Sequence, residues 1–267
     1  RDCLLSRGLG DVYKRQGNTH QDGIISSTGM DRYNVKVSAD TKLTNNWSSG
    51  FTANYITTSI DKAVTSGNGL LRTVYAAPPS YDLAGIPSHV DGNPYTQNSF
   101  RGSFDNAYWA MENNKFTEDT NRFFGNVYAS YQTDFGTTNH KLNAKYMVGV
   151  DAYTTHYVDS YGYGSNTGGG RGQIENYGWT NATYNSLLTI NYDWHINEDW
   201  GLNAVVGNEI IQSNRKKYYE YGTNYNFPGW NHINNATTQQ TEEETWKNRT
   251  VGFFGNVSAS YRNMLYL

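Results

Sequence analysis

Alternation of apolar and polar residues dominates this chain. From Leu142 to Ala152 every second residue is apolar or small, and Lys141, Asn143 and Lys145 fall between them. Successive side chains of a β-strand point to opposite faces, so this period gives a strand one apolar and one mostly polar face. A transmembrane β-barrel requires such strands, because lipid covers one face while water or a plug covers the other. The chain is therefore expected to be all-β, an up-and-down antiparallel barrel segment.

The same pattern predicts about eight strands, joined by connections that are alternately short and long. The strands are expected near residues 32–41, 51–57, 122–133, 141–152, 184–194, 200–206 and 251–261, with a truncated eighth after residue 263. Short turns are expected at 42–47, 134–139 and 195–199, and long connections at 61–120, 158–181 and 213–247. Outer-membrane barrels alternate turns and loops in this way, so the three long connections are expected on one side of the membrane.

Two further features favour a barrel. Trp47, Trp194 and Trp200 flank the short turns, where an interfacial aromatic belt would lie. The run FFGNV occurs at 123–127 and again at 253–257, each time after a long connection. The alternative is a soluble or surface-attached β-rich carbohydrate-binding protein built as a β-sandwich, whose strands also alternate. One set of side chains distinguishes the two architectures, because it contacts lipid in a barrel and a shared protein core in a sandwich. The set is Val35, Leu142, Tyr146, Val148, Leu188 and Val206.

Composition excludes several other classes of protein. No run of about 20 apolar residues is present, which excludes helical membrane spans. The net charge of −3 gives no basic surface for nucleic acid. Cys3 is the single cysteine, so neither a disulfide framework nor a cysteine-based zinc site is possible.

Residues 1–16, RDCLLSRGLGDVYKRQ, differ from the rest because they have no periodicity. This run resembles translated adapter sequence and is interpreted as a non-native segment that packs against nothing; a natural flexible segment is the alternative. Residues 17–267 are then the partial barrel domain. The chain is expected to be a fragment at both ends.

Several longer segments resemble the SusC/RagA family of TonB-dependent outer-membrane transporters. They are GMDRYNVKVSAD (29–40) with NNW (45–47), TVYAAPPSYDLAGIPSH (73–89), NAYWAMENNKF (106–116), NRFFGNV (121–127), FPGWNHINNAT (227–237) and RTVGFFGNVSASYRNMLYL (249–267). The resemblance extends over residues 17–267.

The resemblance implies a barrel of about 22 strands with a plugged lumen, of which this chain would be an open arc of about a third. Members of the family import oligosaccharides or peptides across the outer membrane of Gram-negative bacteria. They work with a SusD-like lipoprotein on the extracellular face and are energised by TonB. TonB would act through a plug region that is expected to be missing from this chain. The signal peptide, the TonB box and the C-terminal strands are expected to be missing as well.

No enzymatic activity and no catalytic, cofactor or metal site is expected. The six histidines have no metal-ligand spacing; they are His20, His89, His140, His156, His195 and His232. The glycine-rich run at 162–172 lacks the residues of a phosphate-binding loop and is interpreted as a flexible loop. Glu242, Glu243 and Glu244 could suggest acid catalysis or calcium binding, and are interpreted as a solvated acidic rim of a loop. Substrate-binding residues cannot be assigned.

Aromatic residues are abundant in the expected long connections. They are Tyr75, Tyr81, Tyr95, Tyr108, Trp109, Tyr161, Tyr163, Trp179, Tyr218, Tyr219, Tyr221, Tyr225, Phe227 and Trp230. Amphipathic rings favour contact surfaces. Three roles stay open for them: contact with the lipoprotein, stacking on a ligand, or packing of the loops against each other.

Overall fold

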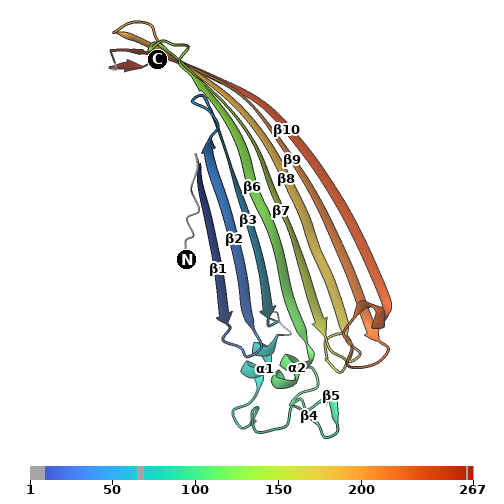
Figure 1. Cartoon of the computed structure of the whole chain (residues 1–267). Helices are drawn as coiled ribbons and strands as arrows, with labels where there is room; N and C mark the ends of the chain where they lie inside the picture. The colour runs from blue at the N-terminus through green and yellow to red at the C-terminus, as the bar shows by residue number, and fades with distance from the viewer. Residues whose placement is uncertain (1–9, 65–68, 263, 267) are drawn as a thin grey trace.

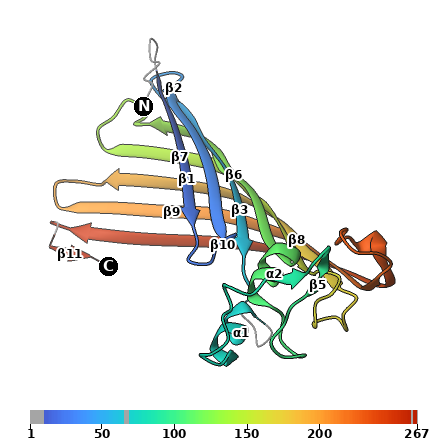
Figure 2. The ribbon, with the colours of Figure 1, turned by 90° about the horizontal axis from the view of Figure 1, so that it is seen from below.

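One large antiparallel sheet makes up most of the computed structural model, which describes residues 10–64, 69–262 and 264–266 (Figure 1). Its strands are β1 (Gly10–Asp22), β2 (Gly29–Lys42), β3 (Trp47–Lys62), β6 (Lys115–Thr133), β7 (His140–Tyr161), β8 (Gln173–His195), β9 (Trp200–Tyr225), β10 (Ala236–Tyr261) and β11 (Leu265–Tyr266). The strands pair in sequence order from β1 to β11, and β1 does not close onto the other edge. The sheet is a curved, open arc (Figures 1 and 2), which confirms the up-and-down barrel segment.

The remaining elements gather at one end of the sheet (Figure 1). They are α1 (Leu70–Ala76), β4 (His89–Val90), β5 (Asn93–Gln97), α2 (Ala107–Asn113) and the 3₁₀ helix η1 (Ile233–Asn235). Asn106 caps α2, because its side chain accepts hydrogen bonds from the backbone N–H groups of Tyr108 and Trp109. Within the described part of the chain, no helix is long and apolar enough to cross a membrane.

The strands are longer than the sequence pattern predicts, and β9 and β10 reach 26 residues each. The connections shrink to 63–114, 162–172 and 226–235. The expected boundaries 61–120, 158–181 and 213–247 are therefore wrong. Backbone pairing continues where the apolar alternation stops, because the hydrogen-bond ladder needs only backbone N–H and C=O groups.

Residues assigned to loops from the sequence therefore lie on strands. The structure places Tyr161 on β7, Trp179 on β8, and Tyr218, Tyr219, Tyr221 and Tyr225 on β9. The three glutamates at 242–244 lie on β10, where they are exposed. They do not form the rim of a loop.

The expectation that residues 1–16 pack against nothing is wrong for residues 10–16, which pair with β2 as part of β1. Residues 1–9 lie outside the described residues. Lys14 pairs with Val37 and Gln16 pairs with Val35, so polar side chains of β1 lie beside apolar ones of β2. Backbone hydrogen bonds hold this part of β1, and its side chains do not follow the apolar pattern. A non-native origin of this segment stays a prediction.

The pairing register places every expected apolar set on one face of the sheet, here called the apolar face. Directly paired residues share a face. Val35 pairs with Tyr55, Tyr55 with Phe123, and Phe123 with Ala152. The row continues from Ala152 to Ala182 on β8. The other side of the sheet is called the polar face.

The apolar face is uncovered by the described residues, whose one other sheet is the two-stranded β4–β5. Five of the six diagnostic side chains are 38–54% exposed, namely Val35, Tyr146, Val148, Leu188 and Val206, while Leu142 is half-buried. A small buried core of Ile174, Tyr225 and Ala236 lies at the end of the sheet where the three long connections emerge. The apolar set thus forms no sandwich core.

Aromatic rings border the apolar face at both ends. At the short-turn end Trp47 packs on Tyr131 and Trp200 packs on Tyr261, with ring centroids 5.0 and 4.9 Å apart. Trp194 lies at the same end, at the end of β8, which confirms the shared edge of the three tryptophans. Tyr33, Tyr55, Phe123, Tyr184 and Phe253 form the second border. The strand lengths between the borders, such as 47–55 and 184–194, match the roughly 9–11 residues that a tilted strand needs to cross a bilayer.

A charge in the middle of the apolar face tests whether lipid covers it. We expect Val206→Arg in the complete barrel to lower the free energy of unfolding in a bilayer by about 2–4 kcal/mol. Val205→Arg is the matched control, because Val205 lies on the polar face between Asn191 and Asn256. Urea titration of the barrel in lipid vesicles measures both; equal losses would contradict the assignment of the faces.

Candidate functional site

The three long connections meet in one layer at the end of the sheet opposite the tryptophans (Figure 1). The Gln97 side-chain amide donates a hydrogen bond to the carbonyl oxygen of Gly164, at 2.8 Å. The Asn231 amide donates to the carbonyl oxygen of Asn113, at 2.9 Å. The first contact joins connections 63–114 and 162–172, and the second joins 63–114 to 226–235. These connections are called the loop layer.

The Asp105 carboxylate joins connections 63–114 and 162–172, and its hydrogen bonds are called the Asp105 clasp. Its Oδ1 accepts hydrogen bonds from the Gln97 side chain (2.8 Å) and the Asn166 backbone (2.7 Å). Its Oδ2 accepts one from the Ser165 hydroxyl at 2.5 Å. Hydrogen bonds to a charged acceptor are worth more than neutral ones, so this single carboxylate contributes much of the attachment.

Some aromatic residues of the loop layer are buried, and others are exposed. Trp109 is fully buried, and its indole N–H donates to the carbonyl oxygen of Pro94 at 2.8 Å. In contrast, Phe227 and Trp230 are 50% and 44% exposed. Their rings stack 5.8 Å apart, and the His232 ring stacks on Trp230 at 5.0 Å. Phe227, Trp230 and His232 are called the exposed stack.

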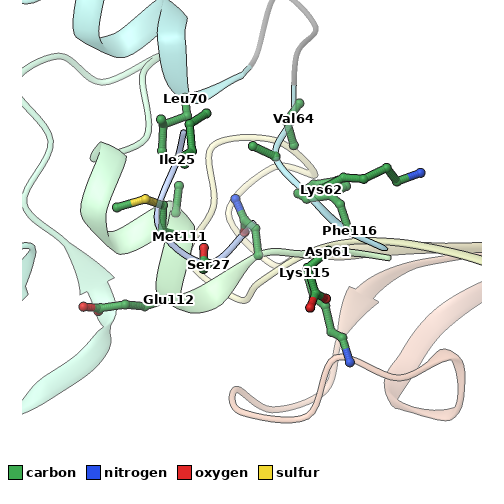
Figure 3. A pocket seen from close by; sticks show the side chains of 13 residues that line it. Ile25, Ser27, Asp61, Lys62, Val64, Leu70, Met111, Glu112, Lys115 and Phe116 are labelled. Atoms are coloured by element: carbon green, nitrogen blue, oxygen red, sulfur yellow. The ribbon is translucent and has the colours of Figure 1, made fainter. Parts of the chain in front are cut away.

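A pocket of about 470 Å³ lies where the loop layer meets the sheet (Figure 3). Ile25, Leu70 and Met111 form an apolar wall on one side, and Phe116 lies on the other. The amine of Lys62 points away from the apolar wall (Figure 3).

Three tyrosines form a row across neighbouring strands on the polar face. The row lies between the second aromatic border and the loop layer. Tyr157 pairs with Tyr177, and Tyr177 pairs with Tyr219. The rings of Tyr157 and Tyr177 stack 4.7 Å apart and nearly parallel, and Trp179 packs edge-on against both. These four residues are called the aromatic patch. The sequence carries a signal for it, because aromatic residues recur at 153, 157 and 161, out of phase with the apolar set.

Charged groups surround the aromatic patch. The Lys62 amine lies 3.5 Å from the Glu118 carboxylate and 4.6 Å from the centre of the Tyr157 ring. In the next row, Asp159 pairs directly with Glu175. The Tyr177 hydroxyl donates to Asp159 Oδ2 at 3.0 Å. Burial and the negative charge of Asp159 together raise the pKa of Glu175 above its usual range.

The histidines do not come together. His140 stacks on Trp194, and His156 contacts Tyr218. His20, on the edge strand β1, lies beside Asp31. Within residues 10–64, 69–262 and 264–266, no group of three or more His, Cys, Asp or Glu side chains is placed to hold a metal ion. The run at 162–172 is confirmed as a loop, with positive φ at Gly164, Gly168, Gly169, Gly170 and Gly172.

Comparison with solved structures identifies this sheet as part of a barrel wall. The chain is similar to the "RagAB peptide transporter", with a TM-score of 0.76 and 12% identity over 99% of this chain and 30% of that chain. It is similar to the RagAB peptide importer in the closed-closed state (0.77, 15%, covering 98% and 30%) and in the open-open state (0.75, 14%, covering 96% and 29%). The fold is that of a partial β-barrel.

The chain spans less than a third of the length of those structures, and at this identity the likeness concerns the fold alone. No protein-family model matches the sequence. No curated protein matches it either.

Replacing the Asp105 clasp is expected to loosen the loop layer. Asp105→Asn removes the charge that strengthens three hydrogen bonds, so amide hydrogen exchange in 69–114 and 162–172 should rise at least about tenfold. Asp91→Asn, between β4 and β5, is the control within the same connection. Unchanged exchange in the Asp105 variant would contradict the clasp.

Replacing Glu175 is expected to stabilise the sheet at neutral pH. Its raised pKa means that the folded state disfavours the ionised carboxylate, so its contribution to stability improves as the pH falls through the folded pKa. Glu175→Gln removes that unfavourable contribution and should raise the unfolding midpoint at pH 7 more than at pH 4. A lower midpoint at pH 7 would refute the interpretation.

Proposed function

We propose that this chain is part of the wall of an outer-membrane transporter of the SusC/RagA type in a Gram-negative bacterium. In this proposal it imports oligosaccharides or peptides, is not an enzyme, and derives its energy from TonB. The apolar face contacts lipid, the polar face lines the lumen, and the loop layer forms the extracellular mouth.

The apolar face and its two aromatic borders are the observation that carries the proposal. A band of this width, bordered by rings that favour the membrane interface, matches the lipid-facing surface of a barrel. The resemblance of the fold to a peptide transporter supports the same conclusion. A soluble carbohydrate-binding protein would leave this face in water, where an uncovered apolar surface of this extent favours aggregation.

We propose further that the loop layer docks a SusD-like lipoprotein. The exposed stack is well suited to act as an anchor, since large rings near the centre of an interface often contribute most of its affinity. The stack is also rigidly placed, because the Asn235 side chain donates hydrogen bonds to the carbonyl oxygens of Phe227 and Trp230, both at 2.8 Å.

Removing the stack from the complete transporter tests this role. Phe227→Ala with Trp230→Ala should lower the affinity for the lipoprotein at least about tenfold and reduce ligand uptake, while barrel assembly stays intact. Phe135→Ala is the control, because Phe135 is an exposed ring, 59% accessible, at the short-turn end. Co-purification with the lipoprotein and uptake by whole cells measure the effect. Full retention of both would overturn the docking role.

A further inference from the structure

A second pocket, of about 320 Å³, lies on the polar face beside the aromatic patch. It is lined mainly by Lys62, Phe116, Asp159, Tyr161, Gln173 and Glu175. The Phe116 and Tyr161 rings meet edge to face 5.2 Å apart and form one wall. If the polar face lines the lumen, as the proposed function requires, this pocket opens toward the path of the ligand.

Two carboxylates in this pocket face each other across neighbouring strands. Asp159 on β7 and Glu175 on β8 are direct partners in the register, and like charges in that position repel. Neither side chain forms an ion pair with any described residue. Asp159 Oδ1 is buried and accepts no hydrogen bond from the described residues. The lining therefore has a net negative charge, because Asp159 and Glu175 are accompanied by a single lining cation, Lys62, which is itself paired with Glu118.

Two cations on this face, Lys62 in the pocket lining and Arg215 further along β9, already have partners among the described residues. Lys62 is shared between Glu118 and the Tyr157 ring. Arg215 lies between the rings of Trp179 and Trp246, at 5.5 and 5.6 Å from their centres. These contacts also show that rings on this face hold cations.

The same geometry disfavours a sugar ring as the occupant. Phe116 and Tyr161, the two rings that line the pocket, meet edge to face, so they offer no continuous flat surface to a pyranose. A compact cation surrounded by carboxylates and ring edges fits better, because charge-assisted hydrogen bonds would satisfy the Asp159–Glu175 pair.

We propose that this pocket binds the ammonium or guanidinium group of a basic side chain, and that the imported ligands are peptides containing lysine or arginine. The inference rests on the proposed transport function and makes its ligand specific.

Binding of matched peptides to the complete transporter tests the inference. One probe is an alanine pentapeptide with arginine at its centre, and the second carries citrulline there, which keeps the shape and loses the charge. We expect the wild-type protein to bind the arginine peptide at least about tenfold more tightly. Asp159→Asn with Glu175→Gln should bind both peptides equally.

Asp193→Asn is the matched control, because Asp193 lies on the same strand and face as Glu175 but at the short-turn end. It should keep the preference for arginine. The thermal unfolding midpoint of each variant confirms that the barrel is folded. A wild-type protein without preference, or a double variant that keeps it, overturns the inference.

A neutral glucose hexasaccharide separates the two levels of the proposal. If the transporter binds citrulline peptide and arginine peptide alike, or only the saccharide, transport stands and the cation pocket is wrong. If cells expressing the complete transporter take up none of the three probes, the proposed function is contradicted as well.

Discussion

The hydrogen-bonded register between neighbouring strands decides where each side chain of this sheet points. Val35, Tyr55, Phe123 and Ala152 share a face because they are direct partners along β2, β3, β6 and β7. A slip of one residue in any strand would exchange the two faces of that strand and turn its apolar side chains toward the polar face of the sheet. The apolar alternation excludes every register that is shifted by an odd number of residues, since such a shift would split the apolar sets between the two faces.

The strands are long enough for one part of a strand to lie in the band between the aromatic borders and another part to lie beyond it. On β8, Leu188 and Trp194 belong to the apolar face, whereas Tyr177 and Trp179 lie further along on the polar face. A patch built on paired strands is held more rigidly than one built on loops, because every backbone group on either side is hydrogen bonded. The stacked tyrosines and the Asp159–Glu175 pair thereby acquire fixed positions.

The sequence predicts the parts of the fold that depend on apolar alternation. It places the residues of the apolar face, the tryptophan edge and the order of the strands from β2 to β11 correctly, because period two and short turns leave few alternatives. It misses β1 and the extensions of β6 to β10, since polar strands such as the one through Glu243 look like loops in a hydropathy pattern. The clasp at Asp105 and the pairing of Asp159 with Glu175 depend on contacts between segments distant in sequence, which periodicity does not contain.

The central claim is that lipid covers the apolar face and water the polar face. Spin-label scanning along residues 201–211 of the complete transporter in a bilayer tests it most directly, with Cys3, the single cysteine of this chain, replaced. The account predicts oxygen accessibility that peaks at 202, 204, 206, 208 and 210, with accessibility to a water-soluble nickel complex peaking at the residues between them. Uniform accessibility, or apolar positions shielded from oxygen by protein, would contradict it.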